Sequence, residues 1–281
     1  MRFKTTKNRH HEKGFEAKKS LGQNFLTNPH IVDKIIDAAD LLGDELVVEV
    51  GPGFGILTEA LIKKAGRVIA IEKDTRLIMQ LKLRFLDKKN FELINADALK
   101  VPPPKEPFLF IANIPYSITS PLLDHFIRDN TQNLPRRAVL LVQKEVALKI
   151  CAAPPDMNVL ALHVQTFGKP SIVCHVSRNN FKPKPKVDSA IIKIDFDLSL
   201  RASAKQSGPV SSQPDCFAPT VARNDKSFDL NEYFKLIHQA FAHKRKMLRG
   251  TLPVELLNKA KIDPTRRPET LTMEEWKMLC N

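Results

Sequence analysis

Short apolar runs alternate with amphipathic segments along the chain from residue 46 onward. Five of the runs have the length of a buried strand: 46–50, 68–71, 91–95, 108–112 and 139–142. Segments with helical spacing follow four of them: 56–65, 77–86, 121–127 and 144–150. Strands that alternate with helices in this way predict βαβ units and a parallel sheet. Three further segments are expected to supply the closing strands: 159–167, 172–176 and 187–196.

The pattern changes after residue 198. Residues 199–227 are rich in Ser, Ala, Pro, Gln and Lys and lack an apolar period, which is typical of a linker or an insertion. Asp229 and Thr272 are expected N-caps in a helical part that follows. Helical spacing returns in three segments: 228–242, 254–261 and 273–280. The expected organisation is a basic, disordered tail, a sheet domain, a linker and a helical domain: 1–18, 19–198, 199–227 and 228–281.

The composition is strongly basic, with 44 Lys and Arg against 31 Asp and Glu and a formal net charge of +13 over 281 residues. This excess favours a polyanionic partner, with nucleic acid first and an acidic membrane surface second. No apolar run is long enough for a membrane-spanning helix, and the basic start lacks the apolar centre of a secretory signal. We expect a cytoplasmic protein without a membrane partner, with an organellar location as the alternative. The four cysteines are scattered, so no metal site is expected.

A glycine-rich turn follows the first strand, since Gly51, Gly53 and Gly55 come directly after the apolar run 46–50. Glycine lets the backbone turn tightly and approach a ligand where a Cβ atom would obstruct it. The turn of an NAD-binding protein is the competing interpretation. Its usual spacing puts two residues between the second and third glycines, whereas this chain has one there, which disfavours NAD.

Two carboxylates follow the next two expected strands. Glu72 comes about twenty residues after the glycines, where a carboxylate can accept hydrogen bonds from both ribose hydroxyls of a nucleoside cofactor. Asp97 follows the third strand, where an acceptor can take the amino group of a bound adenine. Either acid alone is typical of a solvated surface charge. Both together, in phase with the glycine turn, indicate a nucleoside site.

Two further motifs give the chain a family resemblance. Asn113-Ile114-Pro115-Tyr116 follows the fourth expected strand, and Lys19-Ser20-Leu21-Gly22-Gln23-Asn24-Phe25-Leu26 lies near the start. Together with Glu49-Val50-Gly51-Pro52-Gly53-Phe54-Gly55, this order resembles the KsgA family of ribosomal RNA adenine dimethyltransferases. The resemblance covers 18–280 apart from the linker, and includes the motifs at 181–189 and 241–249. The erythromycin-resistance 23S rRNA methyltransferases share the core and are the nearest alternative.

The resemblance implies a class I methyltransferase fold, in which a Rossmann-like, mostly parallel, seven-stranded sheet is followed by a small all-α domain. It also implies S-adenosylmethionine as the cofactor, with the segment 19–26 over its methionine end. The expected cofactor-binding residues are Gln23, Asn24, Leu26, Glu49, Gly51, Gly53, Gly55, Glu72, Lys73, Asp97, Ala98 and Asn113.

The Asn113-Ile114-Pro115-Tyr116 motif suits a planar ring that bears an amino group. An adenine amine is a weak nucleophile because its lone pair is delocalised into the ring. The Asn113 side-chain oxygen and the Ile114 carbonyl can accept the two amino hydrogens. Pro115 restricts Ile114 to an extended backbone, and Tyr116 can stack on the base. Catalysis then needs positioning and polarisation but no strong general base. Without the upstream motifs, the same tetrad is typical of an ordinary strand exit.

Phe181 and several cations are the expected contacts with RNA. The resemblance places Phe181 beside the target adenosine as a second stacking wall, and a buried core phenylalanine is the alternative. Lys182, Lys184 and Lys186 alternate with prolines, which favours an extended loop that faces phosphate. A second group is expected on helices in contact with the RNA backbone, with a merely solvated face as the alternative: Lys244, Arg245, Lys246 and Arg249.

These observations lead to one expected function and two rivals. The resemblance implies S-adenosylmethionine-dependent dimethylation of two adjacent adenosines in the 3′-terminal hairpin of small-subunit ribosomal RNA, by a monomer, during assembly of the subunit. One rival is a 23S rRNA methyltransferase of the erythromycin-resistance type. The other is a methyltransferase-derived assembly or transcription factor that binds nucleic acid without catalysis. The presence of Asn113, Tyr116 and the full cofactor set favours an enzyme.

Overall fold

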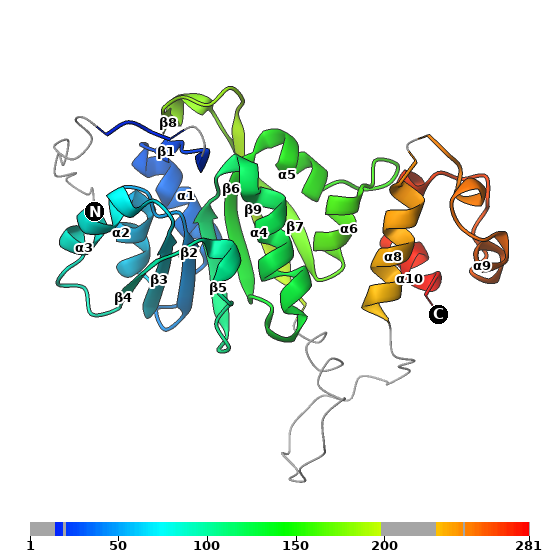
Figure 1. The fold of residues 1–281 in the computed structure, drawn as a ribbon, viewed down its shortest axis with the longest axis horizontal. Helices are drawn as coiled ribbons and strands as arrows, with labels where there is room; N and C mark the ends of the chain where they lie inside the picture. The colour runs from blue at the N-terminus through cyan, green and yellow to red at the C-terminus, as the bar shows by residue number, and fades with distance from the viewer. Residues whose placement is uncertain (1–14, 19–20, 198–228, 244, 281) are drawn as a thin grey trace, which may run out of the picture.

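The structure of the chain is a computed structural model that describes residues 15–18, 21–197, 229–243 and 245–280. A sheet flanked by helices forms most of it, and a group of short helices near the C-terminus lies at one end (Figure 1). Only 15–18 of the predicted tail are described. The rest of that tail, the predicted linker 199–227 and Lys244 lie outside the described residues.

The main sheet has seven strands in the order β4-β3-β2-β5-β6-β9-β7. Neighbours are parallel among β4 (Phe91–Asn95), β3 (Arg67–Glu72), β2 (Leu46–Val50), β5 (Phe108–Asn113) and β6 (Arg137–Gln143). Strand β9 (Ser189–Phe196) pairs antiparallel with β6 and with β7 (Gly168–Val176). The predicted mostly parallel, seven-stranded sheet is confirmed.

The strand order reverses between β2 and β5. The chain runs outward from β2 to β3 and β4, then returns past β2 and forms β5 and β6 on its other side. A crevice forms at the carboxyl ends of parallel strands where such a reversal occurs. Val50 pairs with Ala112, so the glycine turn after β2 and the motif that starts at Asn113 leave the sheet side by side.

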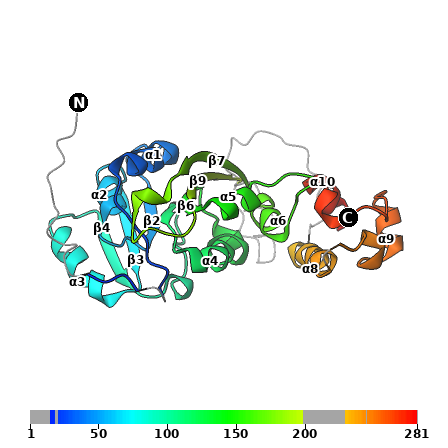
Figure 2. The same ribbon diagram turned by 90° about the horizontal axis from the view of Figure 1, so that it is seen from above.

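Helices cover both faces of the sheet, as the positions of α1 and α4 show in Figure 2. One face packs on α1 (Pro29–Ala39), α2 (Ile56–Ile62) and α3 (Thr75–Arg84). The other packs on α4 (Thr119–Phe126), α5 (Lys144–Ile150) and α6 (Val159–Gln165). Successive β5 residues alternate between the two cores, with Phe110 in one and Ile111 in the other. Burial on both faces explains why the central strands are continuous apolar runs.

One predicted strand is wrong, because residues 159–165 form helix α6. Asn158 caps this helix by accepting a hydrogen bond from the Ala161 N–H at 3.1 Å. Leu162 packs on the C-terminal helices and Val164 on the sheet core, so the helix is apolar on two sides and shows no amphipathic period. Periodicity alone does not distinguish such a run from a strand.

Helix α1 was not predicted, although Asn28-Pro29 is a typical helix start.

The C-terminal part has three α-helices among the described residues, and they share a core of their own. They are α8 (Leu230–Phe241), α9 (Val254–Lys259) and α10 (Met273–Met278). Tyr233 and Trp276 are fully buried between them. Both predicted N-caps are confirmed: Asp229 accepts from the Asn231 N–H at 2.8 Å, and Thr272 forms a capping box with Glu275. Throughout the described ranges, every helix is too short or too polar to cross a membrane.

Phe110→Ala tests the packing of the larger core. Phe110 is fully buried and stacks on Phe126 with ring centroids 4.5 Å apart. The substitution is expected to lower the free energy of unfolding by about 3–5 kcal/mol. Leu83→Ala, on the exposed face of α3, is the control and should change it by less than about 0.5 kcal/mol. Urea unfolding measures both, and equal effects would contradict the assigned packing.

Candidate active site

A pocket opens at the carboxyl ends of β2, β3 and β5, where the strand order reverses. Its walls include apolar residues that were not predicted, among them Ile71, Leu99 and Ile118. Most predicted cofactor and catalytic residues line it: Gln23, Asn24, Gly51, Gly53, Glu72, Lys73, Asp97, Ala98, Asn113, Ile114, Pro115 and Tyr116. Four predicted residues do not line it: Leu26, Glu49, Gly55 and Phe181.

Glycine is required at positions 53 and 55 of the glycine turn for two different structural reasons. Gly53 has φ +59°, and a Cβ there would lie 2.8 Å from Cδ1 of Phe25, so only glycine fits between the turn and the opposite pocket wall. Gly55 has φ +81° and faces away from the pocket, because a Cβ there would lie 2.7 Å from the Phe85 ring. Gly55 is therefore required for packing against α3, and its predicted contact with a cofactor is not supported.

The carboxylate of Glu72 is held at the end of β3 by two backbone N–H groups. Oε1 accepts from Asp74 N at 2.8 Å, and Oε2 accepts from Gly53 N at 3.3 Å. Burial raises the pKa of Glu72, and these backbone hydrogen bonds oppose the increase. Each oxygen keeps a second lone pair, so the group can still accept from the pocket.

Asp97 and Lys73 form an ion pair at the pocket edge, with 2.8 Å between Nζ and Oδ2. The other oxygen of Asp97 accepts from the Leu99 N–H at 3.2 Å. The hydrogen bond from Lys73 lowers the pKa of Asp97, so this carboxylate is charged at neutral pH. The predicted role of Asp97 as an acceptor for an adenine amine stays a prediction.

Glu49 lies beneath the glycine turn with 1% of its surface exposed. Its Oε2 atom has no hydrogen-bond partner among the described residues. Burial raises the pKa of Glu49 to about 8, and the nearby charge of Glu72 adds to the increase. The predicted contact between Glu49 and a cofactor is not supported, because the carboxyl group is enclosed on the far side of the turn.

Asn113 has a fixed orientation. Its Nδ2 donates to the carbonyl of Asn24 at 3.2 Å, which leaves Oδ1 as the free acceptor of the side chain. The Ile114 N–H donates to the Leu141 carbonyl at 3.2 Å and holds the start of the motif to β6. The Ile114 carbonyl accepts no hydrogen bond within the described ranges. The motif thus leaves two acceptors available, and their predicted contact with an amine stays a prediction.

Tyr116 is half-buried, and its hydroxyl lies 2.6 Å from Oγ of Ser189 at the start of β9. Burial raises the pKa of Tyr116, so the phenol is neutral at physiological pH and does not serve as a base. The contact with Ser189 fixes one edge of the ring beside the pocket. Ser189 is the last residue of the 181–189 motif, and no contact with Tyr116 was predicted for it.

Phe181 is the clearest correction among the catalytic predictions. Strands β1 (Phe25–Leu26) and β8 (Phe181–Lys182) form a two-stranded antiparallel ribbon in which Leu26 faces Phe181. Phe181 is 5% exposed and Leu26 is 6% exposed, and both belong to the core that includes α1. Phe181 therefore matches the alternative interpretation, a buried core phenylalanine. Leu26 is a core residue as well.

The predicted RNA-binding cations are in part as expected. Lys182 ends β8, Lys184 and Lys186 lie on the loop that follows it, and all three side chains are exposed. The C-terminal group does not lie on an α-helix as predicted: Arg245 and Lys246 belong to the turn after α8, where Arg245 has φ +79°, and Arg249 lies in a 3-10 turn. All three side chains are exposed.

The fold and the pocket together define the class of protein. The mostly parallel seven-stranded sheet has a glycine turn after β2, a carboxylate at the end of β3 and two acceptors at and after the end of β5. A chain with this fold and this pocket is a class I methyltransferase. A sequence model of the family described as ribosomal RNA adenine dimethylase matches residues 14–200. The chain belongs to this family, and the predicted family, fold and enzyme class are confirmed.

Named relatives match over nearly the whole chain. Ribosomal RNA small subunit methyltransferase A of Dehalococcoides mccartyi is 41% identical, covering 94% of this chain and 88% of its own. The protein of that name from Enterococcus faecalis is 38% identical, with 95% and 90% covered. The solved structure of a Plasmodium falciparum dimethyladenosine transferase is 30% identical with a TM-score of 0.73, covering 91% and 95%. The 23S rRNA methyltransferase ErmE is 27% identical with a TM-score of 0.68, covering 91% and 98%.

Glu49→Gln tests the enclosed carboxyl group. Because burial raises the Glu49 pKa from 4.5 to about 8, the folded chain keeps a proton there that the unfolded chain has released. The wild-type free energy of unfolding should therefore fall as pH rises through this window. The variant carries no titrating group at this position, so its stability should fall less steeply between about pH 5 and about pH 8. Urea unfolding across that range measures the difference, and equal slopes would show that Glu49 is not enclosed.

Proposed function

We propose that this chain transfers methyl groups from S-adenosylmethionine to the N6 amines of two adjacent adenosines in small-subunit ribosomal RNA, two to each. The orientation of Asn113 is the observation that carries the proposal. With its Nδ2 bound to the Asn24 carbonyl, Oδ1 is left as an acceptor beside the Ile114 carbonyl. Two neighbouring acceptors match the two hydrogens of a primary aromatic amine.

The pocket fits S-adenosylmethionine by the chemistry of its walls. Glu72 offers a carboxylate to ribose hydroxyls, and Asp97 offers one to an adenine amine. Ile71 and Leu99 supply apolar surface for a ring, and the lack of a Cβ at Gly53 leaves room beside Phe25. When bound, this cofactor supplies a methyl group on a sulfonium, which is already a strong electrophile.

The groups of this chain act on the amine of the substrate. Hydrogen bonds from its N–H groups to Asn113 Oδ1 and the Ile114 carbonyl favour a pyramidal nitrogen, whose lone pair is no longer shared with the ring. Methylation makes the nitrogen cationic, so its proton leaves readily to water and no side-chain base is assigned. Tyr116, neutral and anchored by Ser189, is the residue to which we assign stacking on the base.

The assignment of the substrate rests on the relatives and on charge. The two relatives compared are named for the small ribosomal subunit, which favours its RNA over 23S RNA. The exposed cations at Lys184, Lys186, Arg245 and Arg249 suit phosphate contacts that position the RNA without reading its sequence. A paired target base must leave its stack to reach the pocket.

We propose that the protein acts as a cytoplasmic monomer on assembling subunits. Phe181 would contribute to stacking only if its ring left the core.

Asn113→Ala tests the polarising role. The substrate is the small ribosomal subunit without the modification, and mass spectrometry of the RNA should show dimethyladenosine at two neighbouring positions with the wild-type protein. The variant loses one of two acceptors, so kcat should fall by about 100-fold, more than cofactor affinity measured by calorimetry. Tyr116→Phe keeps the ring and serves as the milder comparison.

Three outcomes would contradict the proposal in different ways. Unchanged kcat for Asn113→Ala would remove the polarising role while leaving the activity in place. Methylation of 23S RNA instead of the small subunit would favour the first rival. RNA binding by a wild-type protein that transfers no methyl group would favour the non-catalytic rival.

Arg249→Gln tests the proposed contact with RNA backbone. Loss of one phosphate contact should weaken binding to RNA of any sequence and reduce the slope of log affinity against log salt by about 0.7–0.9. Arg67→Gln removes a cation at the amino end of β3, far along the strand from the pocket, and is the control. Filter binding at several salt concentrations measures both, and a slope equal to that of the control would rule out the contact.

A further inference from the structure

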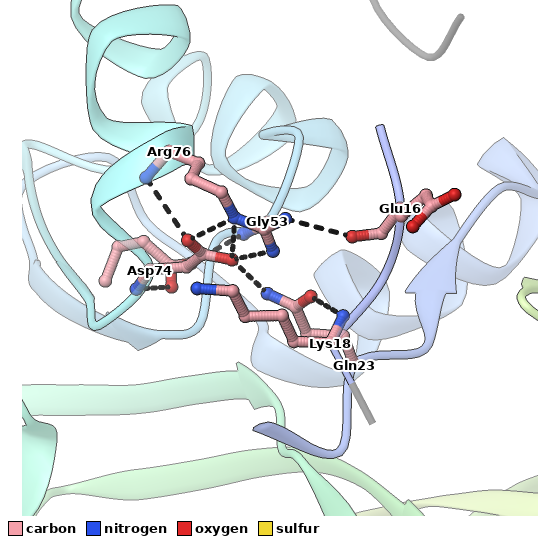
Figure 3. Close-up of polar contacts among 7 residues, drawn as sticks. Glu16, Lys18, Gln23, Gly53, Asp74 and Arg76 are labelled. Carbon is pink, nitrogen blue, oxygen red and sulfur yellow. Dashed lines mark hydrogen bonds and ion pairs between the residues drawn. The ribbon is translucent and has the colours of Figure 1, made fainter. Parts of the chain in front are cut away.

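Asp74 is a buried anion on the loop between β3 and α3, and it does not line the pocket. It is 2% exposed, and the guanidinium of Arg76 donates to both of its oxygens, at 2.9 Å from Nε to Oδ1 and 2.6 Å from Nη2 to Oδ2. Those hydrogen bonds lower the pKa of Asp74 far below its ordinary value. Figure 3 shows this pair facing the segment that precedes the pocket wall.

Gln23 joins that pair to the N-terminal segment, and both ends of its side-chain amide are occupied. Nε2 donates to Asp74 Oδ2 at 2.8 Å, and Oε1 accepts from the Lys18 N–H at 2.7 Å (Figure 3). The charge on Asp74 fixes which end of the amide faces it. These two contacts fix the position of the amide, whereas the sequence suggested a direct contact between Gln23 and the cofactor.

Arg76 holds the same segment at a second point. Its Nη1 donates to the Glu16 carbonyl at 3.1 Å, and its guanidinium lies 4.4 Å from the centroid of the Phe15 ring. Phe15 in turn meets Phe25 and Phe54 edge-on, with centroids 5.8 and 5.2 Å away. Phe25 is the ring that lies against Gly53, so the contact reaches the pocket wall.

The same loop residue also holds the carboxylate that we assign to the ribose. The backbone N–H of Asp74 donates to Glu72 Oε1, while its side chain receives Gln23 and Arg76. Two parts of the pocket therefore depend on the position of one residue: the carboxylate after β3, and the wall of residues 21–25 with its preceding segment.

We propose that Gln23, Asp74 and Arg76 are positioning residues that fasten the segment 15–18 and the wall 21–25 against the pocket, and so slow release of the cofactor. Gln23 acts through Asp74 and not as a ligand. This rests on the proposed function, since it takes S-adenosylmethionine as the occupant. Release rate is the sensitive quantity, because the fastening contributes only while the wall is closed.

Gln23→Glu and Arg76→Lys test this directly. Gln23→Glu puts a carboxylate against the charged Asp74, and Arg76→Lys removes the forked contacts at a residue outside the pocket lining. Each should raise the dissociation rate of S-adenosylmethionine by about tenfold, the effect of losing one charge-assisted hydrogen bond. Stopped-flow displacement by S-adenosylhomocysteine gives the rate, and cleavage by trypsin after the exposed Lys18 should speed up in parallel.

Controls separate positioning from general instability and from direct ligation. Arg67→Lys changes an arginine that pairs with Glu92 and Glu106 at the other end of β3, and should leave release unchanged. Combining Gln23→Glu with Arg76→Lys should raise the release rate by less than the product of the two single effects, because both residues act through Asp74.

The results that would overturn the proposal are distinct from those that would overturn the function. A wild-type release rate in Arg76→Lys, or a double variant whose effect equals the product of the two single effects, would show that Gln23 acts as a ligand or has no role. If Gln23→Glu does not fold, Arg76→Lys and the trypsin cleavage rate still decide. Failure of the wild-type protein to bind S-adenosylmethionine would instead refute the proposed function.

Discussion

The hydrogen bonds from Gly53 and Asp74 to Glu72 are the interaction on which the rest of the site depends. They join the turn after β2 to the loop after β3, at the edge of the sheet where the carboxyl ends of these two parallel strands lie side by side. A buried carboxylate is costly without such donors, and here the backbone supplies one to each oxygen. The side chain of Glu72 is thus held in one position at the pocket by two backbone N–H groups.

Glu49 and Glu72 show how one sheet edge holds two acids at once. Glu72 has backbone donors and faces the pocket, whereas Glu49 is enclosed with an oxygen that has no partner in the described part of the chain. Two neighbouring negative charges would each raise the pKa of the other. A proton on Glu49 at neutral pH removes that repulsion between the two carboxyl groups.

The sequence allowed the central sheet and the pocket floor to be predicted because both depend on local patterns. Strands buried on two faces are continuous apolar runs, and strands 46–50 and 91–95 have the predicted bounds. The misassigned 159–167 segment is apolar because it lies between two cores, which a single-chain pattern does not reveal.

Residues that line the pocket were predictable where they end a strand in a motif, as Glu72 and Asn113 do. Residues whose surroundings depend on contacts between distant segments were not predictable. Phe181 is buried by a ribbon formed with residues some 150 positions earlier, and Gln23 is occupied by Asp74 across 51 positions. Asp74 was missed because its only sequence signal is that of an N-cap for α3.

The short β1–β8 ribbon has a mechanical consequence. Besides the pairing of Leu26 with Phe181, the Asn180 carbonyl accepts from the Thr27 N–H at 2.9 Å, and Asn28 bonds the Asn180 side chain at 2.7 Å. The stretch that ends the pocket wall and the stretch that begins the lysine-bearing loop are therefore joined by hydrogen bonds of both backbone and side chains. The pocket wall at 21–25 and the lysines at 182–186 lie at the two ends of one hydrogen-bonded ribbon, so the geometry of each depends on the other.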